Sequence, residues 1–342
     1  MGKKISKVLI LTECGKSVGY GHFSRCLSIA SQFLTRGVEC LLVIDGEPNY
    51  FQNHDNRIKI LRRPWIRDPS AVKSLVSDAK GIVIDSITIT SRTLQNIVKT
   101  NPQIAIIDDW HRRNHKNGLV IDWTVGAERF AYRKKNPQVQ YLLGAKYCTI
   151  RPAFETRNRK AIRTGISRIL LTFGGSDPRG MTPVVSRLLE HHHPDVFQEI
   201  VLGPGVDRKI ISHFKKTSPC RKIIHSRCSE YKMHALMESV DLAITAGGQT
   251  LYELACVGTP SICIEVVDNQ RDDIREFQKK GFLAYAGKWN HPRLNARLLS
   301  NMRNFESLSV RKSASLKGRK LVDGKGARRL VSSCLSAWRK NA

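Results

Sequence analysis

The sequence alternates strand and helix signals from one end to the other, and the alternation runs twice. Short apolar runs, such as residues 7–12 and 168–173, are each followed by a turn and by a segment with helical spacing of apolar side chains. Strands that alternate with helices form parallel sheets covered by helices. The sequence therefore predicts an α/β protein with two Rossmann-like domains facing each other across a cleft, where ligands bind at the carboxyl ends of the strands.

One polar segment interrupts the alternation. Residues 156–167 are basic and lack apolar periodicity, as is typical of a linker between domains. We therefore expect an N-terminal domain over residues 1–155, a linker at 156–167 and a C-terminal domain over 168–342 that ends in basic helices.

The charge balance is unusual, because the 342 residues carry a formal net charge of +28. Such a field attracts polyanions, which include nucleic acids, anionic lipid surfaces and phosphorylated small molecules. A generally basic surface is the simpler interpretation, and no stacking, helix-turn-helix or finger motif accompanies the charge, so we predict no specific nucleic-acid partner.

Apolar runs and cysteines narrow the class of protein further. No apolar run reaches the ~18–20 residues that a membrane-spanning helix needs. The nine cysteines are scattered and form no C-x-x-C pair, which favours reduced thiols over a disulfide framework or a zinc site. We therefore expect a cytoplasmic protein, and the sequence makes no prediction of its oligomeric state.

The first strand-to-helix turn, residues 19–26, has the sequence GYGHFSRC. Gly19 and Gly21 allow a tight turn and a close approach of the backbone to a ligand. His22 comes at the start of the helix, where it could act as a general base, and Arg25 follows one turn later, where we expect it to contact the substrate. The alternative is a histidine that caps or packs the helix.

Two further turns carry paired glycines. Gly174, Gly175 and Ser176 follow the strand that opens the second domain and could hold a phosphate through backbone N–H groups and a hydroxyl. The same sequence would also make a structural turn without a ligand. Gly247 and Gly248 end a later strand of this domain.

The second glycine pair opens a helix, and the free N–H groups of its first turn form an anion site. Thr250 lies at this start, and Glu253 follows one turn into the helix, where a carboxylate could accept two hydroxyls such as those of a ribose. The alternative for Glu253 is a solvated helix residue.

Polar residues also follow two other strands. Asn269 and Gln270 offer amide groups at the next strand end, although they could equally cap the helix that begins there. Carboxylates also stand at strand ends of the first domain, at Asp85, Asp108 and Asp109, and Asp108 and Asp109 have no partner ligands at a spacing typical of metal sites. We interpret the two aspartates as structural or substrate-positioning, and we predict no metal.

In this order, the motifs resemble the pseudaminic-acid-pathway UDP-sugar hydrolase family. The resemblance rests on G-x-G-H-x-x-R-C after the first strand, the Gly-Gly-Ser-Asp-Pro turn, the GGQTLYELACVGTPSI helix and the Asn-Gln pair after it. Residues 141–154 and 322–330 are also similar to the family. The resemblance implies a glycosyltransferase-B fold that binds UDP mainly in its second domain. It also implies metal-independent hydrolysis of a UDP-linked 2,4-diacetamido-2,4,6-trideoxy sugar for pseudaminic acid synthesis, without a cofactor.

The resemblance also assigns roles to residues. It implies that His22 is the catalytic histidine, which helps to deprotonate a water that attacks the anomeric carbon while UDP leaves with inversion. It places Asn269 at the sugar. By analogy with the related transferases, the implied UDP contacts are Gly247, Gly248 and Thr250 for the diphosphate and Glu253 for the ribose.

One position departs from the family pattern. The family usually has I-D-x-Y after its third strand, but here the segment IDSIT places Ile87 where the tyrosine stands, and isoleucine cannot donate a hydrogen bond. The identities of the sugar and of the acceptor are therefore open. The alternative is a transferase of the same fold that passes the sugar to a lipid or surface-polysaccharide acceptor. A basic surface would then contact an anionic membrane, at about 1 kcal/mol per well-placed Lys or Arg.

Overall fold

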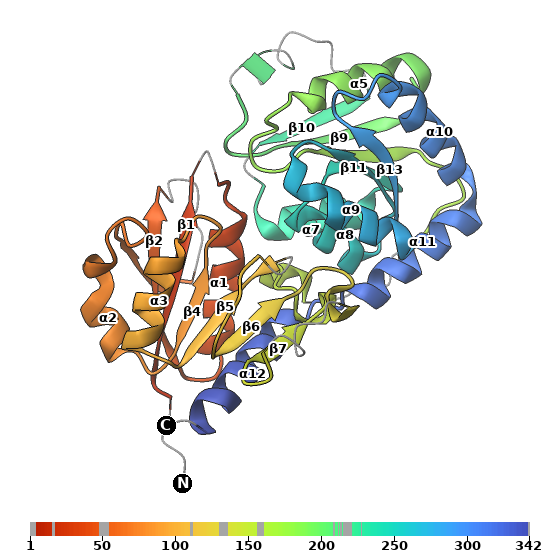
Figure 1. Ribbon diagram of the computed structural model, residues 1–342. Coiled ribbons are helices and arrows are strands. Elements are labelled where there is room, and N and C mark those ends of the chain that lie inside the picture. Colours follow the sequence, from red (N-terminus) through yellow and green to blue (C-terminus); the bar gives the residue numbers. More distant parts are fainter. Residues whose placement is uncertain are drawn as a thin grey trace. The chain divides into compact units, whose positions relative to one another are not determined.

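The chain divides into two compact units, each described here by itself. Unit 1 consists of Met1–Arg151 with Lys325–Ala342, and unit 2 of Pro152–Gly324. Each unit contains one parallel sheet with helices packed on it, in agreement with the predicted α/β class (Figure 1). The structure, a computed structural model, describes residues 5–15, 18–47, 55–109, 112–129, 136–155, 161–207, 209–210, 212, 214, 221–226 and 228–340.

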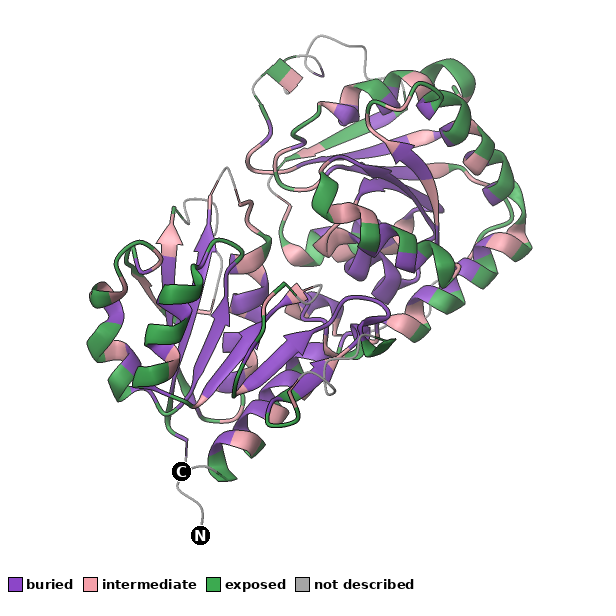
Figure 2. Cartoon of the chain, in the orientation of Figure 1, coloured by how far each residue is buried: buried purple, intermediate pink, exposed green. Residues whose placement is uncertain are grey.

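The sheet of unit 1 has seven strands in the order β3-β2-β1-β4-β5-β6-β7, and all neighbouring strands are parallel. Its central strands are buried on both faces because helices cover the sheet on either side (Figure 2). The strands are β1 (Lys7–Cys14), β2 (Glu39–Gly46), β3 (Lys59–Arg62), β4 (Ile82–Asp85), β5 (Ile104–Ile107), β6 (Leu119–Asp122) and β7 (Gln140–Leu143).

Successive side chains of a strand point to opposite faces, so β1 serves two helical layers. Leu9 and Leu11 pack with apolar residues of α2 and α3 on one face of the sheet. Helices α1 and α12 cover the other face. The helices of unit 1 are α1 (Gly21–Leu34), α2 (Lys73–Asp78), α3 (Ser91–Thr100) and α12 (Gly326–Lys340), with 3₁₀ turns η1 (Pro69–Val72), η3 (Ala127–Arg129) and η4 (Ala145–Tyr147).

The position of α12 differs from the predicted domain boundaries, which placed residues 168–342 in one domain. In the structure α12 packs within unit 1, where the Trp338 ring stacks on Phe33 of α1 with 6.0 Å between centroids. Gly81 makes room for this ring, since a Cβ there would lie 2.3 Å from it. The apolar stripe of α12 is visible in the sequence, but its partner is more than 290 residues away along the chain.

Unit 2 repeats the same plan with six strands in the order β10-β9-β8-β11-β12-β13, again all parallel. The strands are β8 (Arg168–Thr172), β9 (Phe197–Leu202), β10 (Lys222–Ser226), β11 (Leu242–Ala246), β12 (Ser261–Glu265) and β13 (Leu283–Lys288).

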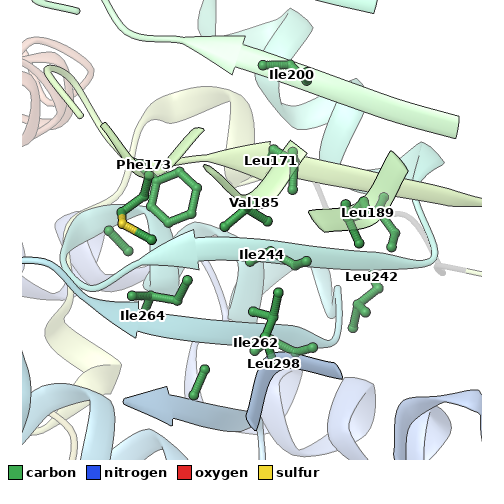
Figure 3. Close-up of a cluster of buried hydrophobic side chains, with 14 of the residues drawn as sticks. Leu171, Phe173, Val185, Leu189, Ile200, Leu242, Ile244, Ile262, Ile264 and Leu298 are labelled. Atoms are coloured by element: carbon green, nitrogen blue, oxygen red, sulfur yellow. The ribbon is translucent and has the colours of Figure 1, made fainter. Parts of the chain in front are cut away.

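Helices pack on both faces of this sheet as well. On one face, Val185 and Leu189 of α5 and Leu298 of α10 pack against Ile244 and Ile262 in the centre of the sheet (Figure 3). The helices are α5 (Met181–His192), α7 (Glu230–Ser239), α8 (Gln249–Val257), α9 (Arg271–Lys279), α10 (Leu294–Glu306) and α11 (Leu308–Leu321), with 3₁₀ turns η5 (Pro152–Phe154) and η6 (Asp268–Gln270).

Only the second half of the predicted linker can be described, because residues 156–160 lie outside the described part. Residues 163–165 are tied to unit 2 by the buried side chain of Arg311. Its guanidinium donates to the carbonyl oxygens of Arg163, Thr164 and Gly165 at 3.0, 2.7 and 3.2 Å. This half of the segment is therefore part of the second unit.

The thiols and helices also bear on the predicted class. Eight described cysteines are free thiols, and all of them except Cys228 are buried. Within the described ranges, no helix combines the length and hydropathy that crossing a bilayer requires.

Each sheet has one switch point. It lies between two neighbouring strands from which the order of the strands along the chain runs toward opposite edges of the sheet. This point lies between β1 and β4 in unit 1 and between β8 and β11 in unit 2. Ligands of open parallel sheets bind beside the carboxyl ends of the strands at such a point. Three of the four predicted site motifs follow one of these strands, and the Asn-Gln pair does not.

Candidate active site

The β1–α1 turn brings His22 to the switch point of unit 1. Gly15 and Gly19 close the turn by two backbone hydrogen bonds of 3.1 and 2.8 Å, and Gly19 has a φ of +77°, which favours glycine. Helix α1 begins at Gly21, so His22 lies in its first turn, as predicted.

His22 is paired with a buried carboxylate from the neighbouring strand. Its Nδ1 lies 2.8 Å from Oδ1 of Asp85, the last residue of β4, and the side chains are 14% and 0% exposed. Burial alone would raise the pKa of Asp85. The charges of Arg25 and His22 and their hydrogen bonds outweigh this effect and hold the pKa well below its usual range. Asp85 is therefore a carboxylate, and it anchors the imidazole.

Arg25 supplies the positive charge that keeps Asp85 ionised. Its Nε and Nη2 donate to the two oxygens of Asp85 at 2.5 and 2.6 Å, and its Nη1 donates to Asp109 at 3.2 Å. The guanidinium also lies 4.7 Å from the ring centroid of Trp123. The sequence predicted a substrate contact for Arg25, but the structure buries this side chain and directs it to two carboxylates.

The contact with Asp85 determines which nitrogen of His22 can act as a base. A carboxylate only accepts hydrogen bonds, so the 2.8 Å contact is favourable when Nδ1 carries the proton, although Arg25 Nη2 also lies 3.0 Å from Nδ1. The other nitrogen, Nε2, then keeps its lone pair. No described residue forms a hydrogen bond with Nε2, and this nitrogen is the one able to take a proton from a ligand.

Sequence reasoning noted Asp85 only as a carboxylate at a strand end and did not pair it with His22. The signal lies in the strand order, because β1 and β4 are neighbours and Thr12 pairs with Asp85 in their register. The residues that follow these two strands therefore meet at one edge. From the sequence alone, the choice among the carboxylates that end strands was undetermined.

The loop after Asp85 is held by the end of β1. Glu13 accepts hydrogen bonds from the backbone N–H groups of Ile87 and Thr88, at 2.5 and 3.1 Å, and also from the Thr88 hydroxyl. These bonds hold Ile87 two residues after Asp85, the partner of His22. Ile87 is 39% exposed. The position where the family has a tyrosine is therefore an exposed apolar position in this chain.

Asp108 and Asp109 have different surroundings. Asp108 is buried, accepts from the Arg113 backbone at 3.0 Å and lies 2.9 Å from His115 Nε2, so its oxygens serve the local fold. Asp109 shares Arg25 with Asp85. Among the described residues, no group of three or more His, Cys, Asp or Glu side chains is placed to hold a metal ion.

In unit 2, the turn with Gly174, Gly175 and Ser176 leads into a helix that is already capped. The Asp177 carboxylate accepts from the N–H groups of Met181 and Thr182 at 2.8 and 2.9 Å, at the start of α5. A side-chain carboxylate at this place satisfies the donors that an external anion would use. The predicted contacts of Gly174, Gly175 and Ser176 with the substrate stay predictions.

The start of α8 is different. Gly248 precedes the helix with a φ of +104°, no atoms crowd the space beside it, and as a glycine it has no side chain that could cap the helix. The first turn of α8 follows the carboxyl end of β11, and Thr250 in this turn is half-buried. Glu253 is buried one turn later, at 2% exposure, which contradicts the alternative of a solvated helix residue.

Gln270 joins this site to the next loop. Its Nε2 donates to the Gly247 carbonyl at 3.0 Å, and its Oε1 accepts from the Val266 N–H at 3.1 Å. A Cβ on Gly247 would lie 2.7 Å from Gln270, so glycine is needed here for close approach. Both ends of the Gln270 amide are thus used by the backbone, whereas Asn269 beside it is exposed.

Comparison with known proteins finds curated relatives and solved structures that this chain resembles. No family model matches the chain. A Helicobacter pylori protein, pseudaminic acid cytidylyltransferase and UDP-2,4-diacetamido-2,4,6-trideoxy-beta-L-altropyranose hydrolase, is 25% identical over 315 residues, which are 91% of this chain and 52% of that protein. The chain therefore spans about half the length of this relative.

Two further comparisons cover nearly the whole chain. The spore coat polysaccharide biosynthesis protein SpsG of Bacillus subtilis is 23% identical over 340 residues, which are 94% of this chain and 96% of that protein. The solved structure of the calicheamicin glycosyltransferase CalG4 aligns with a TM-score of 0.68 at 10% identity and covers 99% of this chain and 100% of that one. The likeness shows the fold, two parallel-sheet α/β domains of the glycosyltransferase-B type.

Proposed function

We propose that the chain hydrolyses a UDP-linked 2,4-diacetamido-2,4,6-trideoxy sugar and releases UDP and the free sugar, for the synthesis of pseudaminic acid. The observation that carries the proposal is the group of His22, Asp85 and Arg25 at the β1/β4 switch point, with Nε2 of the imidazole unbonded by any described residue. The name of the Helicobacter pylori relative includes this reaction, and that likeness supports the choice of substrate.

In the proposed reaction, water attacks the anomeric carbon and His22 Nε2 takes its proton. A bond forms between the water oxygen and the anomeric carbon, while the bond from that carbon to the diphosphate oxygen breaks and its electron pair leaves with UDP. Attack opposite the leaving group inverts the anomeric centre, and the imidazolium returns its proton to solvent. Asp85 orients the ring and stabilises the imidazolium, and Arg25 is a positioning residue that acts through Asp85.

The leaving diphosphate is assigned to the start of α8. Backbone N–H groups at a helix N-terminus carry a partial positive charge equivalent to about half an elementary charge, which stabilises the negative charge that develops on UDP. We place the diphosphate at Gly247, Gly248 and Thr250 and the ribose at Glu253. Gly19 and Gly21 let the backbone before His22 approach the ligand.

The loop after β12 is assigned to the sugar. Asn269 is exposed in this loop, and its amide can both donate to and accept from an acetamido group. Gln270 keeps the loop beside α8 through Gly247 and Val266. We therefore assign Asn269 to substrate contact and Gln270 to positioning.

The test is release of UDP from UDP-linked amino sugars in the absence of an acceptor. We expect stoichiometric release by the wild type, and a loss of about 10²–10⁴-fold in kcat for His22→Ala, the range typical of a lost general base. His191→Ala, at an exposed position on α5, is the matched control and should leave kcat unchanged. Normal turnover by His22→Ala would remove the imidazole from the mechanism.

A glycosyltransferase reaction is the second candidate. It is favoured by the fold shared with CalG4 and by the exposed Ile87 where the hydrolase family has a tyrosine. Release of UDP only after a lipid or polysaccharide acceptor is added would support transfer. Peripheral contact of the basic surface with anionic lipid belongs to this alternative, and sedimentation with phosphatidylglycerol vesicles is its second measurement.

A further inference from the structure

A cavity lies in unit 1, and none of His22, Arg25 and Asp85 lines it. Its volume is about 880 Å³, within the roughly 300–1,000 Å³ typical of small-molecule sites. One end is formed by the carboxyl ends of β1 and β2, and the other by the residues before η1 and the start of α3. The cavity thus opens on the α3 side of the sheet, whereas His22 belongs to α1.

The exposed end of the cavity carries two guanidinium groups. Arg67 and Arg92 both line it and are exposed, and neither forms an ion pair with any described carboxylate. Asn96 lies one turn after Arg92 on α3 and lines the same cavity. Guanidinium groups bind phosphate and carboxylate oxygens by paired hydrogen bonds, so this end suits one anionic group.

The inner end has the opposite character. Glu13 is buried, and its carboxylate is already engaged by the backbone of Ile87 and Thr88. One oxygen of Asp45 accepts from the Ile66 N–H at 2.9 Å, and no described residue donates to the other. Both carboxylates would repel a second anion, and the second oxygen of Asp45 can accept a hydrogen bond from a hydroxyl group.

Hydroxyl groups extend this pattern along one wall. Thr88 and Thr90 line the cavity and are exposed, and both hydroxyls also bond within the fold. The Thr88 hydroxyl donates to Glu13, and the Thr90 hydroxyl accepts from the Thr93 N–H at 3.1 Å as the N-cap of α3, so both keep lone pairs for a ligand. The cavity therefore offers acceptors at its inner end, hydroxyls along a wall and cations at its mouth. A ring with several hydroxyl groups and a single anionic substituent complements all three parts.

We propose that this cavity binds a monosaccharide that carries one anionic group, a phosphate or a carboxylate. The anionic group lies at Arg67 and Arg92, and the ring hydroxyls point toward Asp45. This inference does not rest on the proposed hydrolysis, because it involves neither UDP nor His22.

Isothermal titration of the full chain tests the proposal, with glucose 6-phosphate, glucuronate, glucose and inorganic phosphate as probes. All titrations are made at one ionic strength, because a chain with a net charge of +28 attracts any anion. At least one of the first two probes should bind ten-fold or more tightly than both glucose and phosphate, and the stronger of the two identifies the anionic group. Equal affinity for phosphate and the sugar phosphate would overturn the proposal.

The double variant Arg67→Gln with Arg92→Gln should weaken binding of the preferred probe at least ten-fold. The control is Arg57→Gln with Lys99→Gln, which removes the same charge from exposed positions of unit 1 outside the cavity lining and should change the affinity less than two-fold. Equal weakening in both double variants would mean attraction by net charge alone and contradict the site. An increase in melting temperature with UDP in both double variants would show that they are folded. If UDP did not raise the melting temperature of the wild type, that result would contradict the proposed function but not this inference.

Discussion

The two units have the same strand order around their switch points, β2-β1-β4-β5 and β9-β8-β11-β12, but they place different chemistry there. In unit 1 the carboxyl edge carries charged and titratable side chains, with His22 held by Asp85 and Asp85 by Arg25. In unit 2 the corresponding edge carries the start of α8, where the preceding residue, Gly248, has no side chain to cap the helix.

This difference follows from what each kind of chemistry needs. Transfer of a proton needs a side chain with a lone pair on a defined nitrogen, so its partners must be fixed by buried charges. Binding of a diphosphate needs only oriented dipoles, which a helix supplies at any pH. A buried charge network fails when one member is removed, whereas backbone groups are lost only when they are displaced. The two edges should therefore respond differently to substitution.

The largest effect is expected for Asp85→Asn in unit 1. The asparagine cannot balance the buried charge of Arg25, and breaking a buried ion pair in this way costs about 3–5 kcal/mol in the free energy of unfolding. It also replaces the carboxylate beside His22 Nδ1 by a neutral amide, which can present its NH2 donor to Nδ1 and does not stabilise the imidazolium, so we expect kcat for UDP release to fall about 10³-fold, with UDP affinity unchanged. Urea unfolding, turnover and titration with UDP measure the three quantities.

The double variant Asp85→Asn with Arg25→Gln separates charge from catalysis. It removes both charges together, so most of the lost stability should return, while kcat stays low because His22 still lacks its carboxylate. If turnover recovered along with stability, the role of Asp85 would be confined to folding.

A smaller effect is expected for Gly247→Ala in unit 2. The new Cβ would lie 2.7 Å from Gln270, so the Gln270 side chain must move and lose its bonds to Gly247 and Val266. Crowding of this kind costs about 1–3 kcal/mol. The start of α8 should shift with it and weaken UDP binding about ten-fold, as measured by calorimetry.

Gly165→Ala is the matched control for this variant, because no atom lies within 4 Å of its added Cβ and it belongs to the same unit. It should leave stability and UDP affinity unchanged. Unchanged UDP affinity in Gly247→Ala as well would show that the diphosphate does not lie at α8.

The alternation of strands and helices predicted the architecture because each element is determined by local periodicity. Residues 7–12 and 168–173 were predicted as strands, and they form most of β1 and contain all of β8. Strands β3 and β13 were not predicted. The helix at the chain end was assigned to the wrong unit, because a local apolar stripe does not say which distant surface covers it.

The site was predictable to the extent that its residues come directly after strands. Paired glycines are typical of turns with positive φ, and for this reason the sequence predicted turns at Gly19 and Gly248, both of which have a positive φ. Contacts between turns were not predictable, because they depend on strand order. The pairing of His22 with Asp85 and the bridge from Gln270 to Gly247 both arise between segments that are neighbours only in the sheet.

The smallest effect on ligand binding is expected for Asp177→Ala, which distinguishes α5 from α8 within unit 2. The variant loses the two cap hydrogen bonds to Met181 and Thr182, and loss of a cap costs about 0.5–2 kcal/mol of stability. Asp177 also has a φ of +42°, so Asp177→Gly separates the lost cap from backbone strain. UDP affinity should change less than two-fold in both variants, because the anion is assigned to α8. A ten-fold change in affinity would instead place the diphosphate at the start of α5, and the contrast between α5, which Asp177 caps, and α8, which a glycine precedes, would then no longer locate the UDP site.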